Sequence, residues 1–202
     1  MKSLIRTALL AIALPLAQPA FASITTGFVG AFDLSLWQAG TAADGSIDLA
    51  AGPLSVSFVG SDDGSGPASQ SLTILAPVAG IFSFSWAYTT QDIAPVFDAF
   101  GVLINGVFGS VSVDTDPATQ SGTAWFNVAA ADAFGFSVQS FDSTGGRATA
   151  VVSAFQFVEA PPLAVPEPGQ FSLLGLALAA AAAVTRSGRR TQASGTAAQE
   201  AP

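Results

Sequence analysis

The side chains of this chain that could carry out chemistry are almost all carboxylates and hydroxyls. Histidine and cysteine are absent, and the only lysine is Lys2. The lack of histidine and cysteine excludes the usual near-neutral general base, Ser-His and Cys-His nucleophile pairs and the usual zinc ligands. The lack of lysine from residues 23–160 excludes Schiff-base chemistry there. A glycosidase would need two facing carboxylates, one with a raised pKa, but so many aspartates are present that spacing singles out no pair. We therefore predict a protein that is not an enzyme.

Paired aspartates in turn-like segments make calcium the one cofactor that the sequence suggests. Two or three carboxylates together with loop carbonyls satisfy this hard cation. None of the pairs fits a twelve-residue EF-hand loop, and aspartate is common in turns, so solvated turns are the alternative. The candidate pairs are Asp62 with Asp63, Asp114 with Asp116, and Asp44 with Asp48.

The tryptophans are candidates for stacking on sugar rings, because a flat aromatic face packs well against apolar C–H groups. Trp86 has the same parity as Phe82 and Phe84, which predicts that it continues the core-facing stripe of its strand. Trp37 and Trp125 have less regular surroundings, so we take these two as candidate ligand-binding residues. A place in the core is the alternative for both.

The elements that must position these residues are strands. Large apolar and small polar residues alternate with a period of two, and segments rich in glycine and aspartate separate the runs. Asn105-Gly106 suits the two positive-φ positions of a type I′ hairpin. The pattern predicts an all-β fold, an antiparallel β-sandwich of jelly-roll type. The strand-like runs are residues 55–59, 71–74, 82–88, 103–108, 123–128, 134–139 and 148–157.

The predicted sandwich is strongly acidic. Residues 23–160 contain eleven aspartates, one glutamate and a single basic residue, Arg147, so their net charge is −11. Such a charge repels nucleic acid and anionic lipid, and we expect no nucleic-acid partner. A lone arginine usually pairs with a nearby carboxylate, and Asp142 is the expected partner of Arg147.

The N-terminus has the order of a secretory signal peptide. Lys2 and Arg6 make the first six residues basic, residues 7–17 are almost wholly apolar, and Ala20-Phe21-Ala22 is a small-x-small cleavage site. We predict cleavage before Ser23, with the secretion translocon and signal peptidase as partners.

The C-terminus combines a short apolar run with basic residues. Phe171 to Val184 is apolar apart from Ser172, and these positions would extend about 21 Å as a helix, against a hydrocarbon core of about 30 Å. We predict a weak transmembrane helix whose stop is an arginine cluster. The cluster is Arg186, Arg189 and Arg190. The predicted organisation is a signal peptide (1–22), a β-sandwich ectodomain (23–160), a Pro-rich linker (161–170), a transmembrane helix with the arginine cluster (171–190) and a disordered polar tail (191–202).

Val165-Pro166-Glu167-Pro168, followed by the apolar run and the arginine cluster, resembles the PEP-CTERM sorting signal. The resemblance implies that an exosortase, a membrane transpeptidase-like enzyme, recognises and cuts the Pro-Glu-Pro element. It also implies a Gram-negative host that makes exopolysaccharide. The two prolines fix φ and lack amide donors, so this segment should stay extended and accessible to a protease-like groove.

Part of the ectodomain also resembles other ectodomains of the same sorted group, which look like jelly-roll sandwiches related in shape to carbohydrate-binding modules. The stretch that carries this resemblance is residues 126–157.

We therefore predict a non-enzymatic, exported surface or matrix protein of exopolysaccharide or biofilm, held transiently in the inner membrane and then placed on the cell surface or outside it. The alternative is a carbohydrate-binding protein with polysaccharide as its partner, with or without a structural calcium ion.

Overall fold

The alternation of apolar and small polar residues produces the strands of this protein. The computed structural model describes residues 22–115 and 118–161, and all of its strands lie in the first of two units into which the chain divides, residues 1–161 and 162–202. Each strand-like run predicted from the sequence falls within an observed strand or hairpin. The strands are β1 (Ile24–Thr26), β2 (Gln38–Gly40), β3 (Ser46–Asp48), β4 (Ser55–Val59), β5 (Ala68–Leu75), β6 (Gly80–Thr90), β7 (Asp98–Ile104), β8 (Val107–Ser110), β9 (Thr119–Val128), β10 (Ala133–Ser140) and β11 (Ala148–Glu159).

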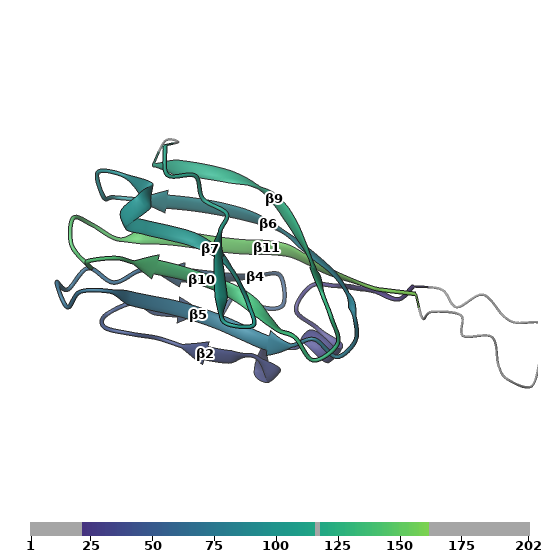
Figure 1. Ribbon diagram of the computed structural model, residues 1–202. Coiled ribbons are helices and arrows are strands. Elements are labelled where there is room, and N and C mark those ends of the chain that lie inside the picture. Colours follow the sequence, from purple (N-terminus) through teal and green to yellow (C-terminus); the bar gives the residue numbers. More distant parts are fainter. Residues whose placement is uncertain (1–21, 116–117, 162–202) are drawn as a thin grey trace, which may run out of the picture. The chain divides into compact units, whose positions relative to one another are not determined.

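Two antiparallel sheets form the layers of a sandwich (Figure 1). The first sheet has the order β3-β4-β11-β6-β9, with β1 also paired to β11, and the second has the order β2-β5-β10-β7-β8. Three short 3-10 helices join strands, at Gly30–Phe32, Leu34–Leu36 and Pro95–Phe97. The prediction of an all-β antiparallel sandwich is confirmed.

The core between the sheets is mainly aromatic. On β6, Phe82, Phe84 and Tyr88 point inward and are buried, whereas Ser83 and Ser85 alternate with them on the outer side. Trp86 is partly buried against the core, as its parity predicted. The fully buried phenylalanines are Phe28, Phe32, Phe58, Phe82, Phe84, Phe100, Phe134, Phe136, Phe155 and Phe157.

The Asn-Gly hairpin is confirmed. Asn105 and Gly106 both have positive φ, 51° and 79°, and they connect β7 directly to β8. This pair of angles is the one that a type I′ turn requires, because it matches the right-handed twist of the flanking strands.

The two ends of the described domain meet at the C-terminal end of β11. The Glu159 N–H donates to the Ser23 carbonyl at 2.9 Å, and the Ala160 N–H donates to the Ala79 carbonyl at 2.8 Å. The predicted cleavage point before Ser23 therefore lies beside the start of the linker. Across residues 22–115 and 118–161, no helix is long and apolar enough to cross a membrane; the helix predicted at 171–190 lies outside this range.

Candidate functional site

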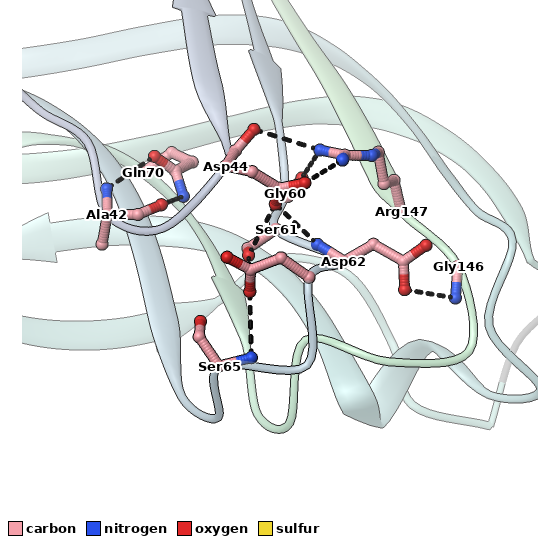
Figure 2. Close-up of polar contacts among 10 residues, drawn as sticks. Ala42, Asp44, Gly60, Ser61, Asp62, Ser65, Gln70, Gly146 and Arg147 are labelled. Atoms are coloured by element: carbon pink, nitrogen blue, oxygen red, sulfur yellow. Dashed lines mark hydrogen bonds and ion pairs between the residues drawn. The ribbon is translucent and has the colours of Figure 1, made fainter.

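A cluster of polar residues lies at one end of the sandwich, where three connections meet (Figure 2). Asp44 lies between β2 and β3, residues 60–65 lie between β4 and β5, and Gly146 and Arg147 come just before β11. We call this group the acidic-turn cluster. It contains three of the candidate calcium-binding aspartates, Asp44, Asp62 and Asp63.

Arg147 ties two of these connections together. Its guanidinium donates to the backbone carbonyls of Asp44 at 3.1 Å and Gly60 at 3.2 Å, and it forms an ion pair with the Asp44 carboxylate. The expected pairing with Asp142 is wrong, since that carboxylate accepts the Thr144 N–H at 3.1 Å instead. The reason is the pairing of β11 with β4. This pairing places Arg147 beside Gly60, directly after β4, and from there its side chain reaches Asp44 in the β2–β3 connection.

The carboxylates of the cluster accept hydrogen bonds from nearby donors. Asp44 accepts the Asp62 N–H at 3.0 Å and the Ser61 hydroxyl at 2.8 Å, and the same hydroxyl lies 3.2 Å from an Asp63 oxygen. Hydrogen bonding by the Asp62 N–H, then by Ser61, with a smaller effect of Arg147, lowers the pKa of Asp44. Hydrogen bonds from Ser65 lower the pKa of Asp63. Both groups therefore stay ionised at neutral pH.

This geometry directs the carboxylates toward protein donors. The Asp62 carboxylate, for example, accepts the Gly146 N–H at 3.1 Å. Within the described ranges, no three acidic side chains group closely enough to hold a metal ion. Asp114 is exposed, and Asp116 lies outside the described residues. Calcium at these pairs stays a prediction.

Trp37 is not available to a ligand, because the structure places it in the core, which was the alternative to a stacking platform. Its side chain is 7 % exposed, and the indole N–H donates to the Phe32 carbonyl at 2.9 Å. The 3-10 helices before β2 place the indole at the edge of the core, so its surroundings look irregular in sequence although the ring is buried. It packs against the rings of Phe28, Phe134, Phe136 and Phe155.

Trp125 has the opposite environment. It lies on β9, an edge strand of the first sheet, and 67 % of its side chain is exposed. It pairs in register with Ser83 of β6, whose side chain faces outward, so the indole stands on the outer surface of the sheet. Trp125 is therefore accessible to a ligand at this surface.

A buried carboxylate, Asp98, is a feature that the sequence analysis missed. Asp98 is 2 % exposed and accepts the Thr90 hydroxyl at 3.1 Å, and the Tyr88 hydroxyl donates to its backbone carbonyl. Burial raises the pKa of Asp98, and burial also raises the pKa of Tyr88 to about 12. No sequence signal marks this residue, because it lies in a largely apolar run and only packing encloses it.

Three shallow surface pockets have volumes of about 320 to 350 Å³. Asp33 is the one charged residue in their linings, and hydrogen bonds from Ser35 lower the pKa of this carboxyl. None of these three pockets contains the two facing carboxylates that a glycosidase requires.

The residues predicted for sorting and processing lie outside the described part of the chain, except Ala22 and Ser23, which are both exposed. Those outside it are Ala20, Val165, Pro166, Glu167, Pro168, Arg186, Arg189 and Arg190.

The described residues form a β-sandwich domain, and the comparison with protein families defines the segment that follows it. Residues 164–190 match the PEP-CTERM protein-sorting motif. The chain thus carries this sorting motif, and the resemblance seen in its Pro-Glu-Pro, apolar and arginine elements is confirmed. None of the curated proteins matches the chain.

Solved structures with a similar arrangement include carbohydrate-binding modules. TmCBM61 in complex with β-1,4-galactotriose is 15 % identical, covers 66 % of this chain and 94 % of its own, and gives a TM-score of 0.37. A family 35 module from Clostridium thermocellum is 15 % identical, with coverages of 71 % and 100 % and a TM-score of 0.32. The family 11 module of the same organism, in complex with a β-1,3-1,4-mixed-linked tetrasaccharide, is 11 % identical, with coverages of 70 % and 98 % and a TM-score of 0.35. Similarity at this level assigns no ligand to this chain.

Proposed function

We propose that this protein is an exported, exosortase-processed surface or matrix protein of exopolysaccharide or biofilm, with no enzymatic role. The observation that carries the proposal is the match of residues 164–190 to the PEP-CTERM protein-sorting motif. On this proposal the translocon and signal peptidase act first, the C-terminal segment holds the protein in the inner membrane, and the exosortase then cuts near Glu167.

The domain boundary supports removal of the C-terminal segment from a folded sandwich. Within residues 22–115 and 118–161, the last backbone hydrogen bond to the sandwich is made by Ala160, before the matched motif begins at residue 164. A cut at Pro166-Glu167-Pro168 would therefore remove no strand and no core residue of the described domain. Processing and folding can then proceed independently.

Replacing the central acid of the motif tests the proposal. Glu167→Ala should leave the full-length precursor in an exosortase-bearing host, because the processing enzyme loses its recognition element, whereas the wild-type chain should shorten. Glu200→Ala is the matched control, since this glutamate lies outside the matched residues 164–190. Mature size is read by mass spectrometry of the membrane and medium fractions. A Glu167→Ala chain that shortens like the control would refute the proposed recognition.

Carbohydrate binding is the second candidate function, and the exposure of Trp125 favours it. A tryptophan that is 67 % exposed on a sheet surface contributes little to the core and offers a flat face to a sugar ring. Tryptophan fluorescence during titration with glycans measures this directly, because a sugar stacked on an exposed indole changes its emission.

A further inference from the structure

Small hydroxyl side chains predominate on the outer side of the first sheet, where the partly exposed Ile81 and Val151 also lie. Alternation along β4, β6 and β11 places their serines and threonines on this side, opposite the buried core residues, except Thr90 of β6, which is buried. The register of β6 with β9 adds the threonines and serine of β9 to the same side. We call this surface the hydroxyl face. Its hydroxyl residues are Ser55, Ser57, Ser83, Ser85, Thr89, Thr119, Ser121, Thr123, Thr149 and Ser153.

These hydroxyls form rows that run across the strands. One row is continuous over four neighbouring strands of the sheet, β9, β6, β11 and β4, which lie side by side in Figure 1. With about 4.8 Å between neighbouring strands, the row spans about 14 Å. It consists of Thr123, Ser85, Ser153 and Ser55.

Trp125 stands at one end of the adjacent row. It pairs with Ser83, and Ser83 pairs in turn with Gln156 of β11, so the indole, a hydroxyl and an amide follow one another across the sheet. A hydroxyl is both a donor and an acceptor, and an amide side chain offers both as well. The two rows together therefore present an aromatic face beside groups that can exchange hydrogen bonds with sugar hydroxyls.

The hydroxyl face carries no charge on β4, β6 or β9, although the domain is strongly acidic. The one charged residue of β11 is Glu159, at the C-terminal end of that strand, and the edge strand β3 contributes Asp48, which pairs with Ser57. The overall charge of −11 for residues 23–160 repels a polyanion. An uncharged polymer encounters no such repulsion and no charged side chain that it would have to desolvate.

We propose that the hydroxyl face binds an uncharged polysaccharide laid across the strands, with Trp125 stacked on one sugar ring and the Thr123–Ser85–Ser153–Ser55 row bonded to the sugar hydroxyls. This rests on the second candidate function above and adds to it a location and a ligand class. A second copy of the chain is the competing occupant of the face, and mutual repulsion between two acidic domains opposes it.

Binding of defined glycans to the purified full chain tests the proposal. The probes are mixed-linkage β-glucan, galactomannan and dextran as neutral polymers, and alginate as a polyanion, measured by affinity electrophoresis and calorimetry. We expect at least one neutral polymer to bind, with an affinity that changes less than twofold between low and high salt, and we expect no binding of alginate. Binding of no neutral polymer, or stronger binding of alginate, overturns the proposal.

Matched variants locate the site. Trp125→Ala should weaken binding at least tenfold, whereas Phe141→Ala, which removes a ring that is 59 % exposed in the β10–β11 connection, should leave it unchanged. Ser85→Asp should weaken binding likewise, because it places a charge in the middle of the row. Ser69→Asp, on an exposed position of β5 in the other sheet, should not.

The outcomes distinguish the location of the binding site from carbohydrate binding as a function. Glycan binding that survives Trp125→Ala and Ser85→Asp overturns the hydroxyl face as the site but keeps carbohydrate binding as a function. A glycan-free dimer in sedimentation that Ser85→Asp dissociates overturns the glycan as the occupant. Processing at Glu167 has its own measurement, so failure of the sorting proposal does not affect these results.

Discussion

Replacing Trp37 and Trp125 in turn should separate a core tryptophan from a surface tryptophan. Trp37 is 7 % exposed and its ring centroid lies 5.6 to 5.9 Å from those of four phenylalanines. Truncation of such a buried aromatic residue to alanine costs about 3–5 kcal/mol of unfolding free energy. This is a large part of the roughly 5–15 kcal/mol that holds a typical domain together. Trp125→Ala should change stability by no more than about 0.5 kcal/mol, as is usual for exposed positions.

The assay is urea and thermal unfolding followed by far-UV circular dichroism, because fluorescence changes with the number of tryptophans. At about 3 °C per kcal/mol, a loss of about 4 kcal/mol lowers the Tm of Trp37→Ala by roughly 12 °C. Trp37→Phe is an intermediate control: it keeps most of the ring volume but removes the N–H donor to the Phe32 carbonyl, and an unpaired buried acceptor costs about 1–3 kcal/mol. Equal losses for Trp37→Ala and Trp125→Ala would refute the assignment of one ring to the core and the other to the surface.

Three further predictions concern packing, pH and metal. Gly135→Ala should destabilise the fold by about 3 kcal/mol or more, because the added Cβ would lie 1.9 Å from the Leu72 carbonyl oxygen. Gly109→Ala is the control, and it should be neutral or slightly stabilising because no atom lies within 4 Å of the added Cβ. Similar midpoints for the two variants in urea unfolding would contradict this prediction. Burial raises the pKa of Asp98 above its ordinary value near 3.8, so its contribution to stability is present below that pH and is lost as pH rises through the folded pKa. The unfolding free energy of Asp98→Asn, relative to that of wild type, should therefore increase between pH 3 and pH 7. A difference that stays constant across this range would count against a raised pKa of Asp98. If calcium binds the aspartates of residues 62–66, EDTA should lower the Tm and added calcium should restore it, and a Tm indifferent to both removes the calcium prediction.

Local chemistry was enough to predict the strands and the hairpin. On β6 a period of two separates Phe82 and Phe84 from Ser83 and Ser85, and the structure buries the first pair and leaves the second on the outer surface. The three-residue strands β1, β2 and β3 could not be found in this way. A segment of three residues is too short to show a period, and these strands exist because longer neighbours offer them hydrogen-bonding partners.

For the candidate site, too, the positions of the side chains could not be predicted from local sequence alone. Two large aromatic residues, Trp125 and Phe126, are adjacent on β9, so the sequence cannot say which of them faces the core; pairing of Trp125 with the outward Ser83 decides it. Similarly, Arg147 and Asp44 are 103 residues apart, and they meet because β4 pairs with β11 on one side and with β3 on the other.

The sequence by itself therefore determined the class of fold, the inward and outward sides of its regular strands, and the sorting motif at residues 164–190. Each of these depends on residues that are close together along the chain. Only the tertiary structure decided that Trp37 is buried, that Trp125 is exposed and that Asp98 is enclosed. Exposure depends on which distant segments cover a side chain, and sheet order and register, which set those neighbours, are properties of the whole domain.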